Sequence, residues 1–443
     1  MTHLPFETLG VIFSHYAEEE TFQRPLETLL LVCRAWNEAA VGHRTLWNNF
    51  KIHLGHGHIS YVWSVRVSMR MARCGDNIPL YIELHTIPEG QDLALGNGDD
   101  SEYSYVYLDR QSCGYRSITG ECRCANIAAE CAYQALRVLA GPNGEHCARW
   151  RLLKLHLNFV ADRKVASALC DRTPNLTYLE LHGLRLEKRD LDLVVLPSMS
   201  EIKEVVLLDC FFPARHLSLR NVIEATVGWT ETRYVDQELE IGKCYRLQKL
   251  FLRTTEESNI PLPEQLEELR ILNIAGPYIT GDIFETHMPL LSTLVIEVLG
   301  GICDAVWLID LVDSPGIALE NLSHFTIIWD TVNEQDNPGE FVVQPLRDIL
   351  TRARNLKYFG ATGDILGAII RVLWWSQQSN AHGSLDAPDG SVTTLLEGTL
   401  FVNLVSGDSV KINGTETSTF FEDLAKRWKC RAPNMDEYEL FGP

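Results

Sequence analysis

The chain has no long hydrophobic run. No stretch of its 443 residues approaches the roughly eighteen consecutive apolar residues that a membrane-spanning helix needs. The first residues also lack the basic segment, apolar core and small-residue cleavage site of a secretory signal. We therefore expect a soluble protein that stays in the cytoplasm, the nucleus or both, with no membrane partner.

The common sequence motifs of catalysis are also missing. The sequence contains no Gly-x-x-x-x-Gly-Lys-Ser/Thr phosphate loop, and no Gly-x-Gly-x-x-Gly between a strand and a helix. It has neither a Gly-x-Ser-x-Gly elbow nor a His-Glu-x-x-His zinc motif. We therefore expect a protein that is not an enzyme and needs no cofactor.

Positive charge is scarce. The formal net charge at pH 7 is −20, from 39 Lys and Arg against 59 Asp and Glu. A surface with this balance repels nucleic acid and anionic membranes, so we expect neither as a partner. A basic protein partner fits the charge, although an acidic surface also serves solubility alone.

Most of the twelve cysteines stand alone, as expected of a reduced compartment. Two groups of residues that could bind a metal do cluster in the sequence. The first comprises Cys113, Cys122, Cys124, Cys131 and Cys147 with His146, and it lacks the Cys-x-x-Cys spacing of zinc sites. The second is His53, His56 and His58, where a metal or pH-sensing role competes with a solvated linker. We interpret both groups as incidental and predict no metal site.

The first fifty residues form a compact apolar pattern. Pro5 suits the first turn of a helix, and Leu9, Ile12, Phe13 and Tyr16 share one face of it. A second helical run opens at Pro25 and extends through Trp36 to Ala40, and Leu46-Trp47 closes the unit. Three helices of this length cannot bury all their apolar surface among themselves. The remainder either docks on the rest of the chain or binds a partner.

These residues resemble an F-box. Leu4-Pro5 at the start, Val32-Cys33-Arg34-Ala35-Trp36 in the middle and Leu46-Trp47 at the end follow the order of that family's pattern. The resemblance implies a module that binds the Skp-type adaptor, and through it the cullin, of a ubiquitin ligase. The adaptor-binding residues that it implies are Leu4, Pro5, Leu9, Ile12, Leu29, Val32, Cys33 and Trp36.

A different pattern begins near residue 150. Nine copies of an apolar-x-x-apolar-x-apolar pattern follow one another, and their starts are 19 to 34 residues apart. They start at Leu152, Leu176, Ile202, Val222, Leu247, Leu266, Leu291, Leu322 and Leu356. Each copy predicts a short strand, and the connectors over 162–172, 304–312 and 341–354 are long enough for helices.

This array resembles leucine-rich repeats, whose period is about 20–29 residues. The Asn or Cys that the family places after the strand is mostly missing, apart from Cys210, so the resemblance implies an irregular solenoid. The predicted fold class is α/β: a three-helix F-box-like unit followed by an αβ solenoid. A helix over Tyr61 to Cys74, with Val62, Val65 and Met69 on one face, and a strand at Pro79 to Leu84 precede the array.

We expect four regions: an F-box-like unit over 1–52, a linker region over 53–148 with an insertion at 89–124, the array over 149–364, and a capping region over 365–443. In the last region the sequence predicts a helix at Ile365–Trp375, a hairpin of Leu400–Val405 with Ser409–Ile412, and a helix at Phe420–Trp428.

The layout resembles the expanded F-box families with divergent leucine-rich repeats in basidiomycete fungi. It implies the substrate-recognition subunit of a Skp-cullin-F-box ubiquitin ligase, in which the array binds a protein that is to be ubiquitinated. The alternative is a leucine-rich-repeat interaction scaffold outside any ligase, with the helical unit as an N-terminal cap. The substrate-binding residues are not predicted.

Overall fold

The computed structural model divides the chain into two compact units, Met1–Asn221 and Val222–Pro443. The division falls inside the predicted array, between its third and fourth copies. The residues that the structure describes are 4–18, 26–54, 60–86, 123–157, 163–184, 193–208, 210, 219–228, 244–253, 262–276, 279, 282–299, 306–330, 339–361, 400–403, 411–412 and 415–416.

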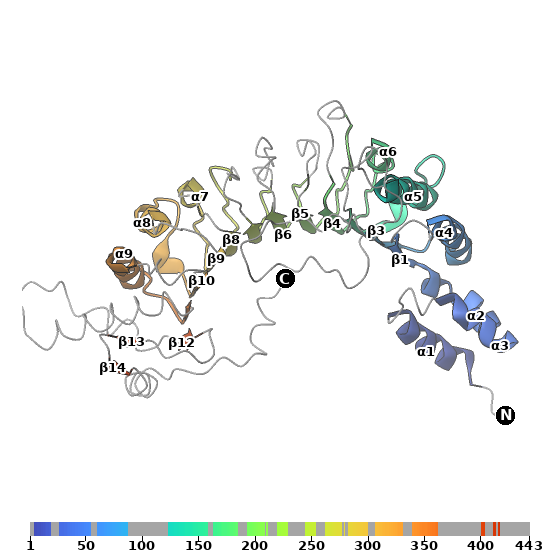
Figure 1. Ribbon diagram of the computed structural model, residues 1–443, viewed down its shortest axis with the longest axis horizontal. Coiled ribbons are helices and arrows are strands. Elements are labelled where there is room, and N and C mark those ends of the chain that lie inside the picture. Colours follow the sequence, from blue (N-terminus) through green and yellow to red (C-terminus); the bar gives the residue numbers. More distant parts are fainter. Residues whose placement is uncertain are drawn as a thin grey trace, which may run out of the picture. The chain divides into compact units, whose positions relative to one another are not determined.

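The first unit opens with short helices, as the sequence predicts (Figure 1). They are α1 (Phe6–Glu18), the 3-10 turn η1 (Leu26–Thr28), α2 (Leu29–Val32), α3 (Arg34–Gly42) and the 3-10 turn η2 (Arg44–Trp47). The predicted second helix is not continuous. Cys33 has extended backbone, with φ −163° and ψ 169°, and separates α2 from α3. The helices pack on a small core of Leu9, Phe13, Leu26, Leu29 and Trp47.

A parallel sheet comes next in the same unit, with its strands in chain order. They are β1 (Asn49–His53), β2 (Leu80–His85), β3 (Trp150–His156), β4 (Tyr178–His182) and β5 (Glu204–Leu208). The helices α4 (Ser60–Cys74), α5 (Arg123–Ala140) and α6 (Arg163–Ser167) lie on one face of this sheet (Figure 1). Strand β1 was not predicted. The parallel sheet therefore begins at Asn49, well before the expected start of the array at residue 149.

Alternating burial explains the strands and corrects the first copy of the repeat. Side chains two residues apart, such as Leu179 and Leu181, are buried beneath the helices. In the strand register Leu153 pairs with Leu179 and Leu155 with Leu181. The first copy is therefore Trp150-x-x-Leu153-x-Leu155, and not the copy predicted to start at Leu152, which is only half-buried.

Helix α4 forms where it was predicted, but its buried face is different. Val65 and Met69 are exposed, whereas Trp63, Val67 and Arg70 are buried. The prediction chose the wrong face because it counted aliphatic residues, whereas the buried face includes Arg70, whose charge is paired with the half-buried Glu27.

The second unit repeats the same architecture. Its strands are paired in the order β6 (Glu224–Gly228), β7 (Lys249–Arg253), β8 (Ile271–Gly276), β9 (Thr293–Leu299), β10 (His324–Asp330), β11 (Tyr358–Ala361) and β12 (Leu400–Asn403), and each pair is parallel. Helices α7 (Asp282–Glu285), α8 (Val306–Asp313) and α9 (Gly339–Arg352) connect strands on one side (Figure 1). The predicted helical connectors α6, α8 and α9 are thus confirmed.

Register also corrects the sixth copy. Leu250 pairs with Leu272 and Leu252 with Ile274, so this copy is Leu269-x-x-Leu272-x-Ile274. The predicted copy started three residues too early, at Leu266, because Leu266 is itself buried in the loop before the strand. Placed correctly, the sixth copy starts 22 residues from each of its neighbours at Leu247 and Leu291.

The predicted C-terminal hairpin is wrong. Leu400–Asn403 pairs in parallel with β11, while β13 (Lys411–Ile412) pairs in antiparallel with β14 (Thr415–Glu416). Asn413-Gly414, a strong two-residue turn signal, lies between these two strands. The helices predicted at Ile365–Trp375 and Phe420–Trp428 lie outside the described residues, as do most of the 89–124 insertion and its cysteines.

Asparagine does occupy a repeated position, but before the strand rather than after it. A side-chain amide at this position donates a hydrogen bond to a backbone carbonyl of the preceding repeat, at 2.6–3.0 Å. The residues are Asn175, Asn221, Asn321 and Asn355. Each of these residues directly precedes the first apolar residue of a copy. The amide therefore bridges successive repeats at the point where the chain enters the sheet.

Candidate functional site

Five of the residues implied by the F-box resemblance are exposed. Leu4, Pro5, Ile12, Val32 and Cys33 face solvent, and Trp36 is half-buried against Phe13, with ring centroids 5.1 Å apart. Leu9 and Leu29 differ, because each is only 3% exposed and belongs to the core of the helical unit. These two support the surface from beneath and do not form part of it.

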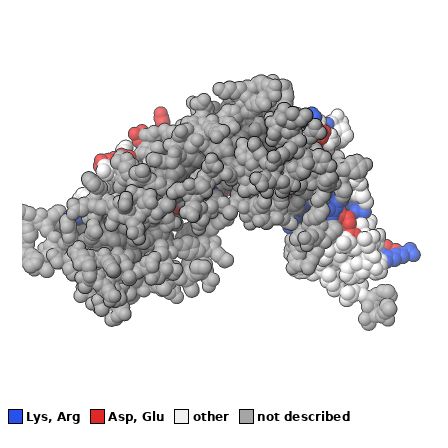
Figure 2. Space-filling model, in the orientation of Figure 1, with Lys and Arg blue, Asp and Glu red and all other residues white. Residues whose placement is uncertain are grey.

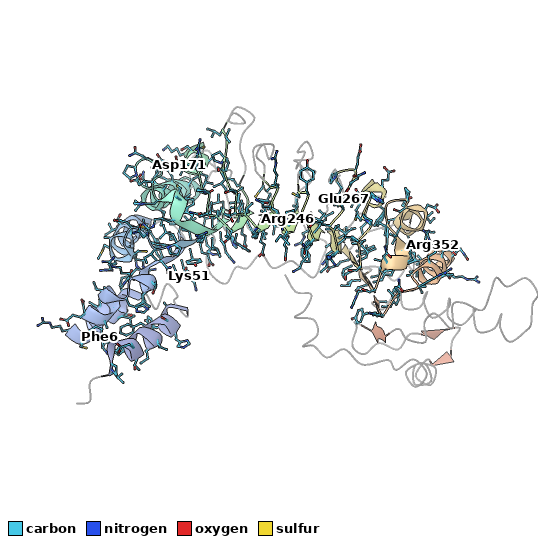
Figure 3. The ribbon with its side chains drawn as sticks, turned by 180° about the vertical axis from the view of Figure 1, so that it is seen from behind. Phe6, Lys51, Asp171, Arg246, Glu267 and Arg352 are labelled. Atoms are coloured by element: carbon cyan, nitrogen blue, oxygen red, sulfur yellow. The ribbon has the colours of Figure 1, made fainter. Side chains whose placement is uncertain are left out.

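Further apolar side chains surround this surface. Phe6, Val11, Leu31 and Val41 are exposed, Leu31 by 85%. Phe6 lies on α1, where Figure 3 labels it, and the visible face of the N-terminal helices is mostly uncharged in Figure 2. Several large apolar side chains left exposed on one small helical unit indicate a surface for binding another protein more often than a plain solvated face. We call the exposed side chains of Leu4, Phe6, Val11, Ile12, Leu31 and Val32 the apolar surface.

The other side of the helical unit is joined to α4. Arg70, 1% exposed, donates from Nε to Oε1 of Glu27 at 2.8 Å, and Arg66 donates to Oε2 at 2.7 Å. Burial raises the pKa of Glu27, but the hydrogen bonds from Arg70 and Arg66 outweigh it and lower the pKa to about 2. Arg73 of α4 also lies 4.6 Å from the ring centroid of the buried Trp47. The apolar surface is therefore held at a fixed position on the first unit.

A second candidate site was missed by the sequence analysis. Four strands of the first unit end with an apolar residue, a charged residue, an apolar residue and a histidine. These tetrads are Phe50-Lys51-Ile52-His53, Ile82-Glu83-Leu84-His85, Leu153-Lys154-Leu155-His156 and Leu179-Glu180-Leu181-His182. The parallel register aligns the histidines across the strands, with His53 opposite His85, His85 opposite His156, and His156 opposite His182. Recurrence of this tetrad was the signal available in the sequence.

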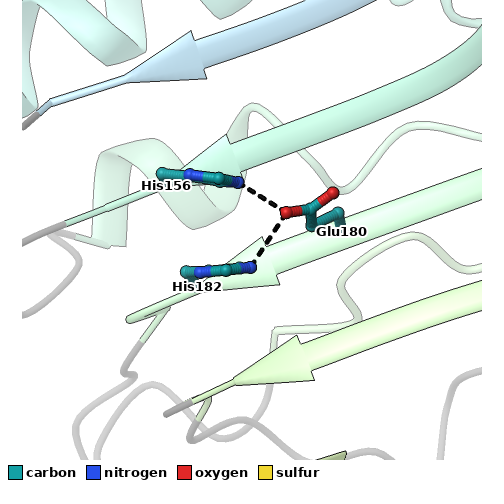
Figure 4. Close-up of side chains that lie close together, drawn as sticks. All are labelled: His156, Glu180 and His182. Carbon is teal, nitrogen blue, oxygen red and sulfur yellow. Dashed lines mark hydrogen bonds and ion pairs between the residues drawn. The ribbon is translucent and has the colours of Figure 1, made fainter. Parts of the chain in front are cut away.

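Three rings of this histidine row, those of His85, His156 and His182, are in contact. His156 and His182 are stacked with centroids 4.0 Å apart, and His85 meets His156 edge-on at 4.3 Å. Glu180 lies between the two stacked rings: its Oε1 is 2.7 Å from Nε2 of His156 and 3.0 Å from Nε2 of His182 (Figure 4). The three ligand atoms lie within 4.8 Å of one another. Among the described residues, this is the group of His, Cys, Asp and Glu side chains that could share a cation.

Neighbouring residues fix the carboxylate of Glu180. The hydroxyl of Tyr178 donates to Oε2 at 2.7 Å, and Nζ of Lys154 lies 3.2 Å from the same oxygen. Burial raises the pKa of Glu180, but the close polar contacts with His156, His182 and Tyr178 outweigh it and hold the pKa well below its usual range. Burial lowers the pKa of His156, which favours its neutral imidazole. A carboxylate between imidazoles can act as a hydrogen-bond acceptor or as a metal ligand.

Several members of the two groups of metal-ligand residues considered from the sequence lie outside the described residues. Cys147 is buried, and burial with the nearby Asp171 and Glu145 carboxylates raises the pKa of its thiol to about 12. Burial also raises the pKa of Cys244 in the second unit to about 12. His53 ends strand β1 and is not in a linker as expected, while His56, His58, Cys113 and Cys122 lie outside the described residues.

Comparison with known proteins adds no assignment: no protein-family model matches this chain, and no curated protein matches it either. Among the described helices, none is long and apolar enough to cross a membrane.

Proposed function

We propose that this protein is the substrate-recognition subunit of a Skp-cullin-F-box ubiquitin ligase. The observation that carries the proposal is the apolar surface on helices whose opposite side is joined to α4. The F-box resemblance of Leu4-Pro5, Val32 to Trp36 and Leu46-Trp47 gives this surface its partner, the Skp-type adaptor. Such a subunit works in the cytoplasm or nucleus.

The mechanism is proximity and not chemistry. A subunit that holds a substrate near the catalytic end of the ligase raises the local concentration of the substrate there. This task requires a rigid connection between the adaptor-binding surface and the rest of the receptor. The buried ion pair between Glu27 and Arg70 supports such a connection.

Binding to a purified Skp-type adaptor tests the proposal. We expect the full-length protein to bind the adaptor, and the double variant Ile12→Asp, Val32→Asp to lose at least tenfold in affinity, because two carboxylates would be buried in an apolar interface. Replacement of Leu4-Pro5 by Ala-Ala should also weaken binding.

Exposed apolar residues outside the helical unit provide the matched control. Val65 and Met69 of α4 are exposed to about the same degree as Ile12, so Val65→Asp with Met69→Asp introduces the same charges elsewhere on the unit. This variant should bind the adaptor as the unaltered protein does. Failure of the unaltered protein to bind, or equal losses in both variants, would contradict the ligase assignment.

The alternative, an interaction scaffold in which the helices only cap the sheet, is favoured by one observation. Trp47, Glu27 and Arg70 pack the helical unit onto α4 at the start of the sheet, as a terminal cap requires. The two proposals differ in the fate of the bound protein. Affinity purification with and without proteasome inhibition should reveal proteins that associate through residues 150–443 and accumulate only in the ligase case. A basic protein is the substrate that the net charge of −20 favours.

A further inference from the structure

We propose that His156, Glu180 and His182 form a binding site for a divalent transition-metal cation of the Zn²⁺ class, on the sheet face of the first unit that the helices leave uncovered. The site is independent of the proposed ligase function and lies on β3 and β4, away from the apolar surface. Its ligands are two imidazole nitrogens and one carboxylate oxygen.

The distances fit such an ion after a small outward movement. Oε1 of Glu180 is 2.7 Å and 3.0 Å from the two Nε2 atoms. Two donor atoms bound tetrahedrally to zinc, at about 2.0–2.1 Å each, lie about 3.3 Å apart. Both distances are a few tenths of an ångström shorter than this, so the side chains must move apart slightly. The two rings, stacked 15° from parallel, must also tilt toward a shared ion. The backbone need not move, because His156 and His182 are already paired across neighbouring strands.

The nitrogen of His182 supports a ligand at this point. Its Nε2 is buried and has no hydrogen-bond partner, although it lies 3.0 Å from Oε1 of Glu180, because the geometry at this distance is not that of a hydrogen bond. Buried polar atoms in native proteins are usually satisfied, so an unsatisfied one needs an explanation. A cation coordinated by this lone pair supplies one.

The surrounding contacts orient the carboxylate toward the two rings. Tyr178 and Lys154 occupy Oε2, which leaves Oε1 facing His156 and His182. Metal sites use outer contacts of this kind to fix the first ligands. Lys154 also lies 5.2 Å from the ring centroid of Tyr178, which holds its ammonium on the far side of the carboxylate.

The ligand types select the class of ion. Imidazole with carboxylate suits Zn²⁺, Ni²⁺ and Cu²⁺, whereas Mg²⁺ and Ca²⁺ prefer ligands that are all oxygen. Three protein ligands leave one position of a tetrahedral ion for water or for a donor from outside. The side chains of His156 and His182 are 22% and 17% exposed, so the site lies close to the surface of the sheet.

Zinc titration of the full-length, reduced protein tests the site. With fourteen histidines and twelve cysteines in the chain, the informative quantity is the difference between variants. Competition with a chromophoric chelator should show that the unaltered protein binds one more Zn²⁺ than Glu180→Gln or than His156→Ala with His182→Ala. Tyr178→Phe should keep this equivalent but bind it about tenfold more weakly, as expected for the loss of an outer contact. Mg²⁺ should not compete.

His324 provides the matched control, since it also lies at a strand position beside an aromatic ring, stacked on Tyr358 in the second unit. His324→Ala should bind as much Zn²⁺ as the unaltered protein. Far-UV circular dichroism establishes that each variant is folded. In selectively ¹⁵N-histidine-labelled protein, Zn²⁺ should shift two ring signals. One of these signals should be absent from His156→Ala and the other from His182→Ala. Equal zinc affinity and stoichiometry in all folded variants, or unshifted signals in the unaltered protein, would overturn the site.

Discussion

Glu27 has the most consequential single contact in the helical unit, because it neutralises a buried arginine. The carboxylate accepts hydrogen bonds from both Arg70 and Arg66, and its own side chain is 22% exposed. A buried arginine that loses its partner keeps its charge, since it cannot deprotonate. Loss of Glu27 would leave the charge of Arg70 buried without a partner. The free-energy cost of that unpaired charge is larger than the net stabilisation that the ion pair contributes to folding.

Glu27→Gln should lower the free energy of unfolding by about 3 kcal/mol at pH 7, the cost of leaving a buried charge without its partner. The lowered pKa of Glu27 indicates an effect of the same size on the free energy of unfolding, since a pKa lowered from 4.5 to about 2 corresponds to about 3 kcal/mol. Because the folded pKa is the lower one, this stability is complete above about pH 4.5 and is lost as the pH falls toward 2. Urea unfolding of both proteins at pH 7 and pH 3 measures it.

The matched control is Glu38→Gln. Glu38 pairs with Arg34 at 2.8 Å, but the two side chains are well exposed, and surface pairs contribute about 0–1 kcal/mol. Its variant should unfold nearly as the unaltered protein does. An equal cost for both variants, or a Glu27→Gln effect that persists undiminished at pH 3, would refute the assigned role of Glu27.

Gly183, directly after His182, is required by the conformation of the backbone. Its φ is +68°, and a Cβ there would lie 1.9 Å from the carbonyl oxygen of Leu157. Gly183→Ala should therefore cost about 2 kcal/mol or more, from left-handed strain and steric overlap together. Gly42→Ala, where a Cβ meets nothing within 4 Å, should be neutral or slightly stabilising. Thermal unfolding of the two variants distinguishes them, and equal melting temperatures would contradict this expectation.

At the scale of elements, strands could be predicted from the sequence more reliably than their register. Apolar pairs such as Leu179 and Leu181 recur with period two, and this indicated where strands lie. Register failed where an additional leucine gave a competing match, at Leu152 and at Leu266. Strand β1 was missed because it directly follows a helical unit.

The asparagines that bridge successive repeats form an element-level prediction. Asn321→Ala and Asn355→Ala should each lower the free energy of unfolding of the second unit by about 1 kcal/mol, the usual net contribution of one hydrogen bond. Gln344→Ala, which removes an exposed contact to Asp348 within α9, should change it by less than about 0.5 kcal/mol. Chemical denaturation measures all three. The bridging role would be refuted if the asparagine variants behaved as the glutamine variant does.

At the scale of the whole molecule, parallel strands in chain order make stability local. Phe325 is fully buried on β10, and its ring lies 5.6 Å from that of Phe359 on β11. Phe325→Ala should cost about 3–5 kcal/mol through the cavity that it leaves. Because each repeat packs on its neighbours, the added hydrogen exchange should concentrate in β9 to β11 and leave β1 to β4 protected. Mass spectrometry of exchanged peptides measures this, and uniform loss of protection would contradict it.

The α/β solenoid-like arrangement could be expected from the repeats, whereas the histidine site was missed although its tetrad recurs in the sequence. His156 and His182 are 26 residues apart in sequence and meet only because β3 and β4 pair in one register. The helical unit shows the opposite case. Its apolar excess was evident from spacing alone, whereas the division between the buried Leu9 and Leu29 and the exposed Ile12 and Val32 required the packed structure.

One buried thiol in each unit can report how often that unit opens. Cys147 in the first unit and Cys244 in the second are buried, with pKa values near 12, so neither reacts as a thiolate while its surroundings are closed. The rate at which an alkylating reagent marks each position is therefore the rate at which that unit opens. Mapping the two modified peptides over time would show whether one unit opens while the other is still folded.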